Sequence, residues 1–90
     1  MNISMKLTDT IDMMQSGDYK ERFRAEYYQI AIRYKKLIKM LEKWDNDELD
    51  FEPTCSRNTY VRQAKSMLEY MGILAERAIV ENIKLDDLVM

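Results

Sequence analysis

A chain of 90 residues and 10.8 kDa accommodates one domain and leaves no room for separate catalytic and binding domains. Hydrophobic residues make up 47% and charged residues 33%, with two glycines and one proline, which excludes disordered and collagen-like chains and favours an all-helical fold. The single cysteine, Cys55, and the absence of histidine exclude an internal disulfide framework, the common zinc sites and histidine acid–base chemistry.

The N-terminal segment predicts a short helix over residues 9–15, with Thr8 as N-cap and Gly17 as a left-handed stop. Residues 1–15 contain no apolar stretch of the kind found in a signal peptide, and the rest of the chain has none long enough for a membrane span. We therefore expect a cytoplasmic protein without a membrane partner.

The next segment predicts a long helix over about 18–44, with Asp18 and Glu21 as a capping box. Its apolar residues alternate at spacings of four and three, which is typical of a helix that packs along one stripe. These residues are Phe23, Tyr27, Ile30, Tyr34, Leu37, Leu41 and Trp44.

Residues 45–55 predict an acidic loop, because turn-forming residues cluster there and Pro53 disfavours helix at the residue before it. A second helix is predicted over about 56–82, with Thr54 or Ser56 as cap, and with Tyr60, Ala64, Met67, Met71, Leu74 and Ala78 at the same spacing. Asn82 is expected to end it in the left-handed conformation. The tail, 83–90, carries no strong signal.

The two stripes predict an antiparallel two-helix hairpin. In an antiparallel pair, the numbers of two residues that face each other have a constant sum, and here that sum is the same for six pairs of stripe residues. The pairs are 23 with 78, 27 with 74, 30 with 71, 34 with 67, 37 with 64 and 41 with 60. The same register predicts that Glu26 faces Arg77 and that Arg33 faces Tyr70.

Apolar residues also lie outside this stripe and need a further packing surface. One flank carries Ala31, Ile38, Val61, Leu68 and Ala75, and a second patch carries Tyr28, Ile32, Ile73, Ile79 and Val80. The short N-terminal helix can cover part of them, and we expect homo-oligomerisation to complete the fold.

Basic residues gather on the first long helix and favour anion binding. Residues 18–44 hold eight basic and four acidic residues, a net charge of +4, whereas residues 45–53 hold five acidic residues and no basic one. Guanidinium groups suit phosphate and tyrosine rings suit base stacking. The candidate ligand-binding residues are Arg22, Arg24, an exposed Tyr28, Arg33, Lys36, Tyr70 and Arg77. Solvated charges and intersubunit salt bridges are the alternative reading.

Signals for other chemistry are absent or incomplete. The acidic loop resembles the start of a calcium loop, but Leu49 occupies its fifth position and Asp50 replaces the required glycine at the sixth, so no metal site is predicted. Cys55 has no histidine to activate it, and no catalytic residue or cofactor is expected. Duplex nucleic acid is not an expected partner, because the chain is acidic overall and its basic residues surround the helix.

Several segments together resemble a known group of proteins: Asp18 to Tyr27, then Arg33-Tyr34, Leu37 and Leu41, then Pro53-Thr54-Cys55, and Glu76-Arg77-Ala78. They resemble short phage and prophage proteins of gut Firmicutes, which are related to a small protein of crAss-like phages. The resemblance covers most of residues 8–85. It implies a phage-encoded accessory protein that acts inside the infected bacterium.

Small oligomeric helical phage proteins include sponges that sequester cyclic nucleotide or ADP-ribose-like signals of bacterial immunity. By this fold-level analogy, the first hypothesis is a non-enzymatic protein that binds such a nucleotide-type signal between subunits. The alternative is a protein–protein interaction module that docks a host or phage protein through the apolar flank that includes Ile38 and Leu68.

Overall fold

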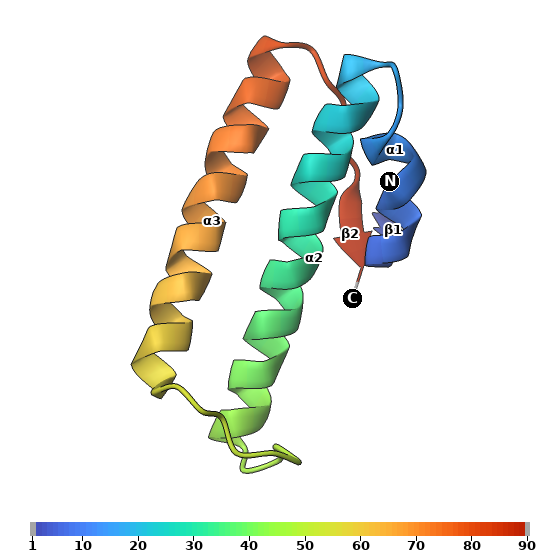
Figure 1. The fold of residues 1–90 in the computed structure, drawn as a ribbon. Helices are drawn as coiled ribbons and strands as arrows, with labels where there is room; N and C mark the ends of the chain where they lie inside the picture. Colours follow the sequence, from blue (N-terminus) through green and yellow to red (C-terminus); the bar gives the residue numbers. More distant parts are fainter. Residues whose placement is uncertain (1, 90) are drawn as a thin grey trace.

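Two long helices and a small N-terminal layer make up the structure, a computed structural model that describes the backbone of residues 2–89 and the side chains of residues 5–86. Its elements are strand β1 (Asn2–Ser4), 3₁₀ helix η1 (Leu7–Thr10), helices α1 (Ile11–Met14), α2 (Tyr19–Asp45) and α3 (Arg57–Val80), and strand β2 (Asp87–Val89). Figure 1 shows α2 between α3 on one side and α1, β1 and β2 on the other. The predicted helical hairpin is confirmed, and its bounds are shifted by one or two residues.

The starts of both long helices are fixed by short polar side chains. The Asp18 carboxylate accepts a hydrogen bond from the Lys20 amide at 3.0 Å, and the Ser56 hydroxyl accepts one from the Thr59 amide at 3.4 Å. These contacts satisfy amides that have no partner within the helix. The predicted left-handed stop at Gly17 is wrong, since no glycine in the described chain has a positive φ.

The end of α3 is a Schellman motif, as the sequence predicts at Asn82. Asn82 has a φ of 57°, its amide donates to the Ile79 carbonyl at 3.3 Å, and the Ile83 amide donates to the Ala78 carbonyl at 2.8 Å. Ile83 is buried against Phe23 and ends the helix with an apolar contact. The turn sends the tail back across α2.

The end of α2 has the same motif, which the sequence analysis missed. Asp47 has a φ of 58°, its amide donates to the Trp44 carbonyl at 3.1 Å, and the Glu48 amide donates to the Lys43 carbonyl at 2.8 Å. An aspartate tolerates this conformation better than most side chains do. The chain reverses here, and the loop residues after Asp47 fold back against the last turns of α2.

The stripe between α2 and α3 forms one core cluster. Phe23, Leu74 and Ala78 are between 1% and 4% exposed, and Tyr27 and Ile30 pack against them. This is the contact that the constant-sum register predicts for 23 with 78 and for 27 with 74. Large residues meet small ones there, so the helices approach without a void.

A second cluster lies on the other side of α2, under the N-terminal layer. Tyr28, Ala31 and Ile32 are at most 2% exposed and are packed against Met5, Leu7, Met13, Tyr27 and Met71. Thr10, 1% exposed, donates a hydrogen bond to the Leu7 carbonyl and accepts one from Gln29, which holds the layer in place. The N-terminal segment thus covers part of the off-stripe apolar surface, through η1 and α1 rather than one helix over 9–15.

The two ends of the chain pair as a parallel two-stranded sheet that the sequence analysis did not predict. Asn2 is opposite Asp87, Ile3 is opposite Leu88 and Ser4 is opposite Val89. The tail over 83–90, which carries no strong sequence signal, thus forms a strand at residues 87–89. None of the helices in the described part of the chain combines the length and the apolar character that crossing a membrane requires.

Candidate functional site

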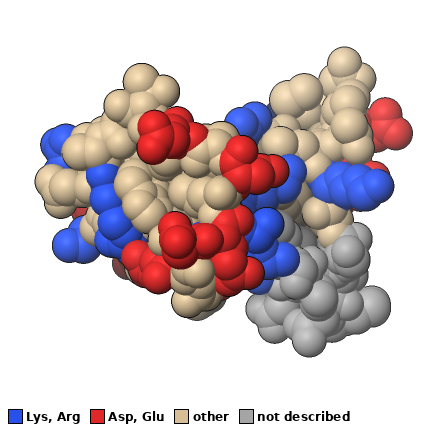
Figure 2. Space-filling model, turned by 90° about the horizontal axis from the view of Figure 1, so that it is seen from below, with Lys and Arg blue, Asp and Glu red and all other residues tan. Residues whose placement is uncertain are grey.

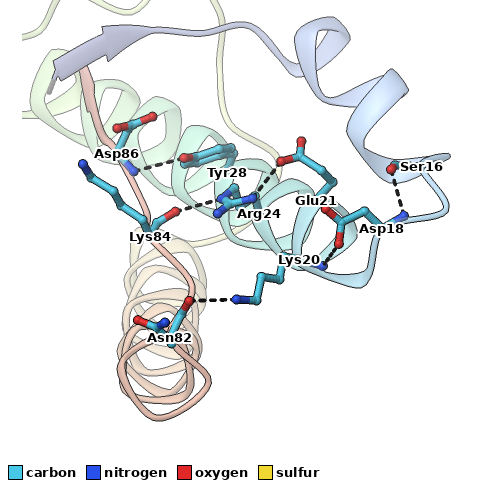
Figure 3. A network of polar contacts seen from close by, with 9 residues as sticks. All are labelled: Ser16, Asp18, Lys20, Glu21, Arg24, Tyr28, Asn82, Lys84 and Asp86. Atoms are coloured by element: carbon cyan, nitrogen blue, oxygen red, sulfur yellow. Dashed lines mark hydrogen bonds and ion pairs between the residues drawn. The ribbon is translucent and has the colours of Figure 1, made fainter.

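Three side chains on α2 hold the C-terminal tail by its backbone (Figure 3). Lys20 Nζ donates to the Asn82 carbonyl at 3.2 Å, Arg24 Nε donates to the Lys84 carbonyl at 2.8 Å, and the Asp86 amide donates to the Tyr28 hydroxyl at 3.0 Å. Four helical residues rise about 6 Å and two extended residues span about 6.6 Å, so every fourth residue of α2 meets every second residue of the tail.

This arrangement gives two of the predicted ligand-binding residues a structural role. Tyr28 is 2% exposed, so the expectation that it is exposed is wrong, and its burial raises the pKa of its phenol. Arg24 also forms an ion pair with Glu21 at 2.7 Å. The tail contacts these side chains through its main chain. For this reason the residue types of the tail gave no indication of these contacts.

Three further predicted residues contact other parts of the chain. Arg22 donates to the Ser16 carbonyl at 2.8 Å. Arg77 donates to Glu81 at 3.1 Å and to the Tyr19 hydroxyl at 3.0 Å, and its guanidinium lies 5.0 Å from the centre of the Phe23 ring. Tyr70 donates to the Glu26 carboxylate, which raises the pKa of Tyr70. Glu26 thus pairs with Tyr70 instead of Arg77, which corrects the predicted flank contacts.

The remaining two predicted residues line separate cavities. Arg33 lies at a cavity of about 330 Å³ against the N-terminal layer, whose other lining residues are Leu7, Thr8, Thr10, Ile11, Met14 and Gln29. Lys36 lies at a cavity of about 280 Å³ between the second half of α2 and the acidic loop. The seven predicted residues therefore do not form one site.

The cavity at Lys36 is the strongest candidate site, and we refer to it as the lysine cavity. Its lining residues are Lys36, Lys39, Met40, Lys43, Glu48, Leu49, Asp50 and Phe51. The first four come from α2, and the last four come from the loop that the turn at Asp47 folds back. Figure 2 looks onto this end of the hairpin and shows acidic side chains gathered beside basic ones.

The three lysines of this cavity share one face of α2, because they are spaced at three and four residues. All three are exposed, and among residues 5–86 none of them forms an ion pair. Lys36 and Lys43 are separated by about 10 Å along the helix. Their ammonium groups are therefore available to an anion that spans one to two helical turns.

The lining of the lysine cavity also includes apolar side chains and an aromatic ring. Met40 and Leu49 are partly buried, and Phe51 is 53% exposed. An exposed ring beside cationic groups suits a ligand that has both a flat ring system and a negative charge. The sequence analysis named Lys36 but missed Lys39, Lys43 and Phe51, although the lysine spacing before the acidic loop was a signal that could have identified them.

Other chemistry has less support in the described residues. Residues 5–86 contain no group of three or more Cys, Asp or Glu side chains placed to hold a metal ion. Cys55 is exposed and does not line the lysine cavity. The cavity offers ammonium groups, two carboxylates and an aromatic face, which can bind an anion by charge and by stacking.

The molecule is thus a small helical hairpin with a lysine-lined cavity at its loop end. The family model described as Sequestin matches residues 17–79, so the chain belongs to this family. The matched residues include α2, the acidic loop and nearly all of α3, and hence the whole lysine cavity. The family name is consistent with a sequestering role. No curated protein and no solved structure matches the chain.

Replacing Tyr28 by phenylalanine tests its structural role. The change leaves the Asp86 amide without its acceptor, and we expect the free energy of unfolding to fall by about 1 kcal/mol, as measured by urea denaturation. An unchanged free energy of unfolding would show that the hold on the tail does not depend on this contact.

Proposed function

We propose that this protein captures a phosphorylated, nucleotide-type signal of bacterial immunity, such as a cyclic oligonucleotide or an ADP-ribose derivative, and holds it without converting it. Membership of the Sequestin family supports the sequestering part of this proposal. The resemblance to short phage proteins supports a phage-encoded protein that acts in the cytoplasm of the infected host.

The observation that carries the nucleotide part is the lysine cavity. Three lysines without ion-pair partners among residues 5–86 line a volume of about 280 Å³. They outnumber the two acidic residues of the lining, Glu48 and Asp50, so the lining is cationic on balance. Phosphate oxygens accept charge-assisted hydrogen bonds from ammonium groups, and each such bond contributes about 1.5–3 kcal/mol. The Phe51 ring offers a stacking surface for a base, which contributes about 1–3 kcal/mol.

We propose that the lysine cavity of each subunit is the site of capture. This differs from the sequence-based hypothesis of a site between subunits, two of whose residues, Arg24 and Tyr28, are engaged by the tail. We retain the hypothesis that the protein is a homo-oligomer, because exposed apolar side chains remain on α3. Several copies would then hold several ligands, which suits a protein that depletes a signal by stoichiometric binding.

Capture without conversion is favoured by the groups that line the cavity. The chain has no histidine, and Cys55 lies outside the cavity lining. Lysine ammonium groups stabilise phosphate by charge and hydrogen bonding. The two carboxylates of the lining, Glu48 and Asp50, are exposed to solvent, whereas general acid–base catalysis uses carboxylates in a desolvated cleft.

The test is a thermal-shift and calorimetric screen with AMP, cyclic dinucleotides, cyclic trinucleotides and ADP-ribose. A ligand at a hundredfold excess over its Kd should stabilise the folded state by about 2.7 kcal/mol, and the melting temperature should rise by several degrees. The ligand should be recovered intact after denaturation. A chemically altered ligand would identify an enzyme, and no shift with any of the four classes would overturn the proposal.

A further inference from the structure

Helix α3 carries a second stripe of mostly apolar and small residues, and the described chain leaves two of its large side chains exposed. Leu68 is 53% exposed and Ile79 is 82% exposed. The stripe repeats the spacing of four and three that marks the buried stripe, and its members are Val61, Lys65, Leu68, Gly72, Ala75 and Ile79. In Figure 1, α3 is the outer helix, with α2 on one side of it only. Such a stripe is typical of a helix that packs against a second helix.

Gly72 lies at the centre of this stripe, within α3. A Cβ atom placed on Gly72 would meet no atom within 4 Å, so nothing within the chain requires a glycine there. Glycine in a helix interior costs about 1 kcal/mol relative to alanine. A glycine that weakens α3 and has no contact within the chain fits a close approach by another helix.

The exposed surface of the chain exceeds that of a compact monomer. Its accessible area is 6386 Å². A folded monomer of 10.8 kDa has about 5,500 Å², so the excess is roughly 800–900 Å². A standard stable interface buries about 800 Å² per partner. The excess is of the size that one dimer interface removes.

We propose that this stripe of α3 binds the same stripe of a second copy, with the two helices antiparallel around a two-fold axis near position 70. In this register Val61 faces the partner's Ile79, and Leu68 faces the partner's Gly72. The aliphatic part of Lys65 lies over the partner's Ala75. Each large side chain then meets a small or complementary one, as in the buried stripe of the hairpin.

Charge supports a second copy as the occupant of this surface. Lys65 and Glu76 lie on the same edge of the stripe, and neither forms an ion pair within residues 5–86. They are separated by about 16 Å along α3, too far to pair with each other in one chain. In the proposed register each Lys65 reaches the partner's Glu76, and the two-fold axis produces this pair twice.

A charge-swap series tests this interface. In Lys65→Glu and in Glu76→Lys, like charges meet twice, and each variant should weaken the dimer at least tenfold in sedimentation equilibrium. The double variant restores both pairs and should return the Kd to within about threefold of the original. Ser66→Glu, which introduces a charge at an exposed position on the far side of α3 from the stripe, is the control and should leave the Kd unchanged.

A second variant keeps the test decisive if charge changes perturb folding. Gly72→Ala should not lower the helix content or the melting temperature of the dilute chain, because its Cβ has free space, but it should weaken the dimer several-fold. A chain that is monomeric at all concentrations, or a dimer that the double variant does not rescue, would overturn the inference. In the first case the stripe is free for a different protein.

This inference rests on the proposed homo-oligomer but not on the ligand. Lys65, Gly72 and Glu76 lie outside the lysine cavity, so thermal shifts with nucleotides should persist in every variant of the series. Loss of the dimer with retained shifts would support both proposals. A stable dimer without any shift would contradict only the proposed capture.

Discussion

Lys39→Glu is expected to weaken capture of a phosphorylated nucleotide at least a hundredfold. Lys39 lies between Lys36 and Lys43 on the face of α2 that lines the cavity, and the variant removes a cation and introduces an anion there. A hundredfold loss corresponds to about 2.7 kcal/mol, which is within the range of one charge-assisted hydrogen bond. Isothermal titration calorimetry at fixed ionic strength measures the change.

The control for this prediction is Arg62→Glu, which makes the same change of charge on α3 outside the cavity. It should leave the affinity within about twofold. Phe51→Ala should weaken capture about tenfold or more, because a base loses its stacking partner. Equal losses in Lys39→Glu and Arg62→Glu would show that only the net charge of the protein matters, and would contradict a site at the lysine cavity.

Phe23→Ala is expected to destabilise the fold by about 3–5 kcal/mol. Phe23 is 2% exposed and packs against Leu74, Ala78 and Ile83, so its removal leaves a cavity at the contact of α2, α3 and the tail. The guanidinium of Arg77, 5.0 Å from its ring centre, loses its aromatic partner as well. This is a large part of the 5–15 kcal/mol that typically stabilises a small domain. Urea denaturation at fixed protein concentration measures the effect.

Phe51→Ala is the matched control for stability, because it deletes the same side chain at a position that is 53% exposed. It should change the free energy of unfolding by less than about 1 kcal/mol. The two phenylalanine variants therefore separate folding from binding: Phe23 stabilises the fold, and Phe51 is proposed to contact the ligand. Similar losses of stability in both would contradict the assignment of Phe51 to the site.

The hairpin could be predicted from the sequence because its signals are local and repeated. The spacing of apolar residues from Phe23 to Trp44 and from Tyr60 to Ala78 defines two stripes, and their common register defines how they pair. Asn82 was identified as the end of α3 because few residues adopt the left-handed conformation at low cost.

The candidate site could be predicted only in part, because its components meet through backbone contacts and chain reversals. Arg24 and Tyr28 resembled ligand-binding residues, and nothing in the residue types of the tail showed that its main chain would occupy them. Lys36 was identified by its charge. Phe51 joins it only because the turn at Asp47 brings the loop back to α2, and aspartate is a weaker signal for that turn than glycine or asparagine.

The parallel pairing of β1 with β2 also bears on the order in which the molecule assembles. Asn2 and Asp87 are opposite each other although almost the entire chain separates them, so this contact closes the longest loop that the described residues form. Long loops cost the most entropy to close and contribute to slow steps in folding. The hairpin, whose contacts are closer in sequence, should therefore form first and serve as the template on which the two ends meet.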